Sequence, residues 1–136
     1  MTHTPETRAT RGGATAIPMS DGLLELVVTP EGAGGATYDG LALTRFTRDR
    51  ARDEGGLWLY LRDMESGAAW SATLLPMHGA PDAYRVRASD ALVEIVRRDG
   101  DVEVTTEICA AGGNAELRRY TITNHGSATR RHELTT

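Results

Sequence analysis

Three large side chains at alternate positions, Trp58, Tyr60 and Arg62, are of types that suit the binding of a sugar. In an extended strand, residues two apart share one face, so the three side chains would form one platform. Aromatic rings can pack on the apolar face of a pyranose, and a guanidinium can donate hydrogen bonds to hydroxyl groups. Large aromatic residues more often serve burial, so we favour a second packing layer or an interface with another domain over a sugar platform.

Carboxylates that are close in sequence could support acid–base chemistry, and Asp53 with Glu54 and Asp63 with Glu65 are such pairs. Hydrolysis of a glycosidic bond needs two carboxylates that face each other across a cleft. Closeness on a charged loop does not establish such a cleft, and we interpret both pairs as solvated surface charge. We therefore predict no catalytic residue.

Metal and thiol chemistry find little support in the sequence. Zinc sites need close pairs of ligands, whereas His3, His78, His125 and His132 lack that spacing. Cys109 has no neighbouring histidine or helix N-terminus to activate its thiol, so we expect a structural role for it. We predict no metal and no cofactor.

Length and composition narrow the class of protein. The 136 residues are enough for one domain and too few for two ordinary ones. All 15 basic residues are arginine, and the net charge of −4 argues against a nucleic-acid partner. A single cysteine excludes an internal disulfide. The sequence has neither an apolar run of membrane-spanning length nor a secretory signal, so we expect a cytoplasmic protein or the soluble part of something larger.

The hydrophobic pattern predicts an all-β protein. Residues 1–20 are interpreted as a flexible lead-in, and residues 21–136 as one β-sandwich domain. Short apolar runs recur with turn residues between them, at the spacing of about 8–12 residues that is typical of an antiparallel sandwich or barrel. We expect strands at 23–29, 41–46, 57–63, 68–75, 82–88, 91–98, 101–110, 115–123 and 128–136, which makes about nine. The last one looks cut short, so we expect a truncated sandwich.

Turn signals separate these strands. Asp39-Gly40 and Asp99-Gly100 are hairpin pairs. The glycine-rich stretch 30–35 precedes a strand rather than the helix that a phosphate-binding loop needs, so we expect a hairpin or bulge there.

The two-residue period of a strand predicts which side chains form the core. Leu57, Leu59 and Leu61 should point into the sandwich, and the aromatic face of the same strand should lie opposite. Both faces carry large side chains that favour burial, so this strand should be central or should contact another domain. The residues expected in the leucine layer are Val86, Val104 and Ile108.

Several motifs occur in an order and at a spacing that resemble one known family. They are Leu41 to Phe46, Arg48 to Glu54, Tyr60 to Asp63, Ser66-Gly67, Trp70 to Ala72, PDAYRV at 81–86, Thr121 to His125 and the final HELTT. This chain resembles the N-terminal β-supersandwich domain of glycoside hydrolase family 94, formerly glycosyltransferase family 36. The cyclic β-1,2-glucan synthase and cellobiose phosphorylase types are the most similar. The resemblance covers roughly residues 20 to 136.

Two departures from the family pattern concern aromatic positions. Tyr38 stands where the family usually has Trp after its Gly-rich turn, and the preceding Arg is absent. Phe46 replaces another usual Trp.

The resemblance implies that catalysis belongs to a different domain. In this family the general acid and the phosphate site lie in an (α/α)₆ barrel that follows the sandwich. On that basis we expect a fragment, or a free-standing sandwich, that is not an enzyme on its own. Its expected partners are the barrel domain or a second protomer, and a β-glucan oligosaccharide, within the cytoplasm or the soluble part of a larger membrane-associated synthase.

The candidates for carbohydrate-binding or interdomain contacts are Tyr38, Trp58, Tyr60, Arg62 and Asp63. The alternatives to a domain of a glycoside phosphorylase or glucan synthase are a free-standing carbohydrate-binding module and a remnant without function.

Overall fold

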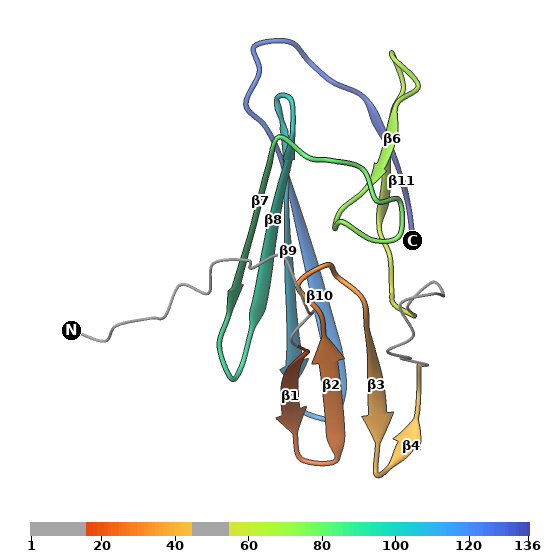
Figure 1. Ribbon diagram of the computed structural model, residues 1–136, viewed down its shortest axis with the longest axis vertical. Coiled ribbons are helices and arrows are strands. Elements are labelled where there is room, and N and C mark those ends of the chain that lie inside the picture. Colours follow the sequence, from red (N-terminus) through yellow and green to blue (C-terminus); the bar gives the residue numbers. More distant parts are fainter. Residues whose placement is uncertain (1–15, 45–54) are drawn as a thin grey trace, which may run out of the picture.

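The computed structural model describes residues 16–44 and 55–136, and within these ranges it consists of strands and turns with no helix (Figure 1). The strands are β1 (Ile17–Asp21), β2 (Leu24–Val28), β3 (Gly34–Tyr38), β4 (Leu41–Ala42), β5 (Tyr60–Asp63), β6 (Ala69–Ser71), β7 (Ala83–Ala88), β8 (Val93–Asp99), β9 (Val102–Ala111), β10 (Ala115–Asn124) and β11 (His132–Thr135). The predicted all-β class is confirmed.

The strands form three antiparallel sheets (Figure 1). The N-terminal sheet has the order β1-β2-β3-β4, the long sheet β10-β9-β8-β7, and the small sheet β11-β5-β6. Every neighbouring pair except β11 with β5 is a sequential hairpin, so most of the pairing is local. The expectation of a central strand is confirmed for β5, which lies between β11 and β6.

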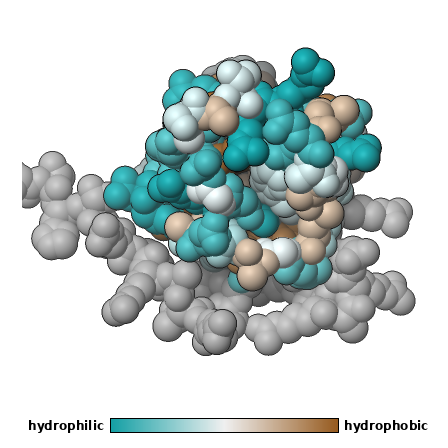
Figure 2. All heavy atoms as spheres, turned by 90° about the horizontal axis from the view of Figure 1, so that it is seen from above, coloured by the Kyte–Doolittle hydropathy of each residue, from teal (hydrophilic) through white to brown (hydrophobic). Residues whose placement is uncertain are grey.

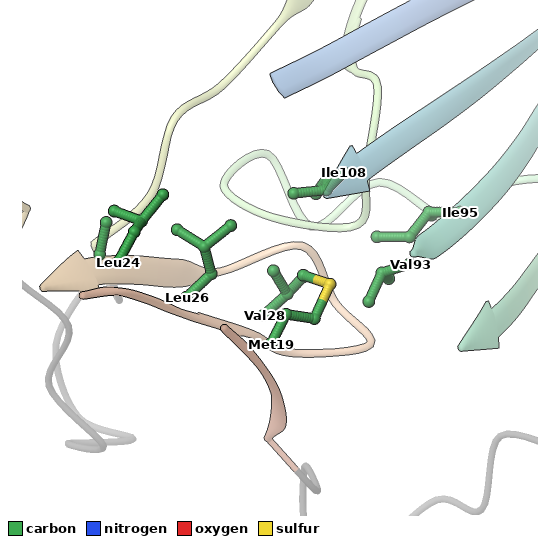
Figure 3. Packing of buried hydrophobic residues seen from close by; sticks show 8 residues of the cluster. Met19, Leu24, Leu26, Val28, Val93, Ile95 and Ile108 are labelled. Carbon is green, nitrogen blue, oxygen red and sulfur yellow. The ribbon is translucent and has the colours of Figure 1, made fainter. Parts of the chain in front are cut away.

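The long sheet is one layer of the sandwich, and the other two sheets share the opposite layer. Alternate residues of its strands project toward them, as the two-residue period requires. Near one end, Val93, Ile95 and Ile108 pack with residues of the N-terminal sheet (Figure 3). Near the other end, Val104 packs with Leu59, Leu61 and Ala72 around the small sheet. The sandwich therefore has two hydrophobic clusters on a single face.

Two glycine positions show why the N-terminal sheet folds as it does. Asp39 and Gly40 both have positive φ, at 47° and 76°, which confirms the predicted two-residue hairpin between β3 and β4. A Cβ at Gly34 would collide with the carbonyl oxygen of Val27, so β3 can pair with β2 at this point only with glycine.

The sequence analysis missed two strands. β1 begins at Ile17, so residues 17–20, expected as part of the lead-in, are strand, and Met19 is buried in the core. β3 lies partly in the stretch where a hairpin or bulge was expected, because its glycines conceal the apolar alternation of a strand. The rest of the expected lead-in, residues 1–15, lies outside the described residues.

The prediction that the leucines of the expected strand 57–63 point into the core is only partly correct. The strand begins at Tyr60, and Leu57 is 48% exposed instead of pointing into the core. Leu59 and Leu61 are buried as expected, at 5% and 0% exposure, and share their cluster with Val104. The other two residues expected in this layer, Val86 and Ile108, belong to the cluster under the N-terminal sheet.

Replacing Leu61 by alanine should lower the free energy of unfolding by about 2–5 kcal/mol, because the side chain is fully enclosed and its loss leaves a cavity. Leu57→Ala is the matched control and should change it by less than about 1 kcal/mol, since that side chain is half-exposed. Urea unfolding measures both values. Equal effects would show that Leu57 is enclosed in solution.

Candidate functional site

Two of the five candidate residues share one hollow. Tyr60 and Arg62 lie on the outward-facing side of the small sheet, at a depression of about 400 Å³. Its lining consists of Tyr60, Leu61, Arg62, Ala69, Met77, Glu133 and Thr135. Arg62 Nη1 lies 3.9 Å from a carboxylate oxygen of Glu133, and both side chains are more than half exposed. Such a pair contributes little to stability and leaves both groups available to a partner.

The other aromatic candidates lie elsewhere. Trp58 packs its ring so closely on Gly56 that a Cβ at Gly56 would come within 2.6 Å of it. Tyr38, at the end of β3, packs against the core cluster under the N-terminal sheet. Neither residue lines the hollow. The structure therefore does not assemble the three-residue platform of alternate positions.

Asp63 organises a turn at the end of β5. Its Oδ1 accepts hydrogen bonds from the backbone N–H groups of Glu65 and Ser66, at 2.8 and 3.1 Å. These bonds favour the charged form and hold the pKa of Asp63 below its ordinary value of 3.8, with smaller contributions from His132 and Arg130. A carboxyl group with a lowered pKa is a poor general acid.

Asp63 also lines a cleft of about 420 Å³ that lies between the small sheet and the long sheet and is separate from the hollow of Tyr60 and Arg62. Its lining consists of Asp63, Ala68, Ala69, Trp70, Gly79, Ala80, Arg97, Asp99, Gly100, Asp101, Val102 and Arg130. Figure 2 looks onto this end of the molecule, and hydrophilic residues cover much of the face that it shows.

A buried arginine forms the wall of this cleft. Arg97 is 1% exposed, and its Nε and Nη2 donate hydrogen bonds of 2.7 and 2.9 Å to the two carboxylate oxygens of Asp99. Its Nη1 donates a third, of 2.8 Å, to the carbonyl oxygen of Thr73. Gly79 leaves room for the guanidinium, because a Cβ there would lie 3.3 Å from Nη2.

Sequence reasoning missed Arg97, although a signal for it existed. Val93, Ile95, Arg97 and Asp99 alternate along β8, so the two polar residues continue an inward-facing apolar row. An arginine and an aspartate two residues apart on such a row could have indicated a buried ion pair.

The remaining charges of the cleft are also paired with one another. Arg130 lies within 3.9 Å of Asp63, 3.9 Å of Glu65 and 3.8 Å of Asp101. The carboxylates that line the cleft thus all have a cationic partner, whether Arg97 or Arg130. Within the described ranges, no group of three or more His, Cys, Asp or Glu side chains is placed to hold a metal ion.

Tyr84 is a second polar residue that sequence reasoning did not single out. Its hydroxyl donates a 2.7 Å hydrogen bond to the carbonyl oxygen of Pro30, which links β7 to the loop after β2. Burial raises the pKa of Tyr84 well above its ordinary value, so the phenol stays protonated and keeps this bond.

The remaining residues weighed for chemistry have structural settings. The ring of His132 meets that of Trp70 edge-on at 5.8 Å, and His125 Nε2 lies 3.6 Å from Glu103. Cys109 is a partly buried free thiol on β9. Asp53 and Glu54 lie outside the described residues. In the part of the chain that the structure describes, no helix has the length and hydropathy needed to cross a bilayer.

Comparison with known proteins gives two matches. The model of the glycosyl hydrolase 94 supersandwich domain matches residues 8–136. The cyclic beta-(1,2)-glucan synthase NdvB of Rhizobium meliloti (strain 1021) is 35% identical to this chain over 118 residues. That alignment covers 86% of this chain and 4% of the relative, so the chain spans only a small part of the relative's length.

Replacing Arg97 by methionine should lower the free energy of unfolding by about 3 kcal/mol, because it leaves the Asp99 carboxylate and a buried carbonyl without their donor. Arg98→Met is the matched control on the opposite face of β8, where the guanidinium makes an exposed bond to the carbonyl oxygen of Gly100. Chemical denaturation of both variants checks this. A similar loss of unfolding free energy in the two variants would contradict the structural role of the Arg97 hydrogen bonds.

The lowered pKa of Asp63 predicts a specific response to acid. A group whose pKa is lower in the folded state stabilises the fold above its unfolded value and loses that effect as pH falls through the folded pKa. Asp63→Asn should therefore flatten the fall in stability below pH 3.8. NMR titration of the Asp63 carboxyl group should give a pKa below 3.8. A pKa above 3.8 would contradict the two backbone hydrogen bonds that stabilise its charged form.

Proposed function

This chain belongs to the glycosyl hydrolase 94 supersandwich family, and from that membership we propose that it acts as a non-catalytic β-sandwich domain of a carbohydrate-active enzyme. The enzyme would be of the glycoside phosphorylase or glucan synthase type, and the sandwich would pack on its helical-barrel catalytic domain. The observation that carries the proposal is the family match over residues 8–136, which is nearly the whole chain.

The chemistry of the cleft between the small sheet and the long sheet supports a non-catalytic role. Glycosidic bond cleavage needs one carboxyl group that holds a proton and a second that is free to act as a base or nucleophile. Asp99 is held in a bidentate ion pair, and Asp63 is held charged by backbone donors. Asp101 lies beside Arg130. Asp99 and Asp63 therefore have structural roles in this cleft, and the reaction would be supplied by another domain.

The hollow on the small sheet is the contact that we propose for that domain. It combines Tyr60 with Met77, which is 45% exposed, and Arg62 and Glu133 also line it. Apolar and charged side chains together are the usual composition of a protein interface. Trp58, Tyr38 and Asp63 have internal packing or turn partners, so the proposed contact rests on Tyr60 and Arg62.

A free-standing carbohydrate-binding module is the second candidate, and the same hollow favours it. An aromatic side chain beside an arginine and a glutamate could hold one sugar ring in about 400 Å³. The name of the relative indicates the ligand class to test, which is a β-1,2-linked glucan.

The pure chain should release no glucose 1-phosphate from β-1,2-glucan or cello-oligosaccharides in the presence of inorganic phosphate. The reason is that Asp99 is held by Arg97 and Asp63 by the backbone of its turn. A coupled phosphoglucomutase assay with a cellobiose phosphorylase as positive control measures this. Phosphate-dependent release that scales with the amount of chain would contradict the non-catalytic role.

Titration of the chain with β-1,2-gluco-oligosaccharides separates the two candidates. If the hollow serves a neighbouring domain, amide NMR signals around Tyr60 and Arg62 should not move at millimolar sugar. Saturable shifts there that disappear in Tyr60→Ala, with the fold intact by circular dichroism, would favour the binding module. Leu23→Ala, an exposed apolar position on the β1–β2 turn, is the control substitution.

A further inference from the structure

The outer face of the long sheet is not covered by any other sheet of the described residues. The N-terminal and small sheets both lie against its inner face, where the two hydrophobic clusters are. Residues that alternate with the inward-facing row therefore project outward from β7 and β8. They are Ala83, Arg85 and Arg87 on β7 and Glu94, Val96 and Arg98 on β8.

Three of these outward residues are neighbouring arginines. Arg85 and Arg87 are two residues apart on β7, so about 7 Å separates their Cα atoms. Arg98 on β8 is diagonal to Arg85, because the direct partner of Arg85 is Val96. Diagonal neighbours on a sheet are within reach of each other's long side chains. We call Arg85, Arg87 and Arg98 the arginine patch.

The glutamates of β9 on the same face do not neutralise the arginine patch. Glu107 accepts two hydrogen bonds from Arg119 of β10, at the other margin of the sheet. Glu103 is the cross-strand partner of Arg98, but its carboxylate lies beside His125, at 3.6 Å. Both carboxylates are thus directed to groups outside the patch.

The guanidinium groups of the patch keep hydrogen-bond donors for a partner. Among the described residues, neither Arg85 nor Arg98 has a carboxylate as an ion-pair partner. Arg98 Nε donates a 2.9 Å hydrogen bond to the Gly100 carbonyl, which uses one of its five N–H donors. Arg87 Nη1 lies 3.9 Å from Glu94, and its side chain is 53% exposed. Such an exposed pair contributes little and is easily exchanged for another carboxylate.

The surroundings of the patch favour recognition of charge over burial of apolar surface. Val96, the apolar residue beside the arginines, is only 6% exposed. It pairs with Arg85, and the aliphatic stem of an arginine can cover such a residue while its charged end stays in water. None of the exposed large hydrophobic residues of the described ranges occupies an outward position of β7 or β8. A partner therefore needs anionic groups more than apolar ones.

We propose that the arginine patch is a docking surface for an acidic polypeptide segment in extended conformation. Side chains two residues apart in an extended chain share one face at about 7 Å, which matches the spacing of Arg85 and Arg87. A guanidinium binds a carboxylate through two parallel hydrogen bonds, so each arginine suits one Asp or Glu side chain. The patch and the hollow of Tyr60 and Arg62 lie on different layers, so this docking surface does not depend on the proposed function.

Other anionic partners fit the patch less well. Nucleic-acid binders usually carry a positive net charge, whereas this chain carries −4. Attachment to an anionic membrane usually combines basic residues with apolar side chains that enter the bilayer, and the outward positions of β7 and β8 expose no large apolar side chain. An extended acidic segment requires neither feature.

Fluorescence anisotropy with a labelled peptide tests the proposal on the full chain. The probe is a short peptide that alternates glutamate and threonine, and the control probe has glutamine in place of every glutamate. The glutamate peptide should bind saturably at low salt. Molar salt should weaken its binding by at least about tenfold, because salt screens exposed charges. The glutamine peptide should not bind.

Variants of the chain locate the binding. Arg85→Gln and Arg98→Gln should each weaken the affinity for the glutamate peptide by at least about fivefold, because each removes one guanidinium from the patch. Arg131→Gln is the matched control, since it removes the same charge from an exposed arginine that precedes β11, and it should leave the affinity within about twofold. Circular dichroism verifies that each variant is folded.

Three results would overturn the proposal. The first is the absence of binding at millimolar glutamate peptide and low salt. The second is binding that survives both substitutions in the patch, which would place the peptide elsewhere on the chain. The third is binding to phosphatidylserine vesicles without binding to the peptide, which would assign the patch to an anionic lipid surface.

Discussion

The buried guanidinium of Arg97 joins the long sheet to the small sheet, and the shape of the cleft between them depends on it. Arg97 continues the inward-facing row of Val93 and Ile95, so its guanidinium is cut off from water and must be satisfied by protein groups. Asp99 accepts two of its hydrogen bonds and the Thr73 carbonyl a third. Thr73 follows the small sheet, whereas the other two residues belong to the long sheet. One buried side chain therefore joins the two layers and forms a wall of the cleft between the small sheet and the long sheet.

The two hydrophobic clusters follow from the same row of alternate residues on a single sheet. Ile108 belongs to one cluster and Val104 to the other, although both project from the same face of β9. Between them stands Thr106, which is 1% exposed and pairs with Ile95. The N-terminal and small sheets remain separate sheets within their layer, and the core beneath them is divided into two clusters. Each is fixed by its own cluster, and the polar contacts of Arg97 and Tyr84 add to the links between layers.

The sequence predicted the long sheet well because its strands alternate apolar and polar residues and end at clear turns. β7, β8, β9 and β10 all lie within a residue or two of the expected ranges. β3 escaped prediction because Gly34 is required by close approach to Val27 and carries no hydrophobic signal. Leu57 was misplaced because periodicity shows which residues would share a face, but not where the strand begins. The shared hollow of Tyr60 and Arg62 follows from parity, whereas the separate position of Trp58 depends on its packing against Gly56.

The distribution of unsatisfied groups determines what kind of partner the molecule can take. Near the cleft, the buried Arg97 is held by Asp99, and Asp63 accepts two backbone hydrogen bonds within its own turn. Chemistry on a substrate needs polar groups that are held in place and also free, and these two carboxylates are held in place but are not free. The apolar side chains, in contrast, remain exposed where the sheets end, at Leu41, Ile122 and Leu134. Apolar surface at open strand edges is suited to contact with other polypeptide, because added strands satisfy the backbone and cover the side chains at once.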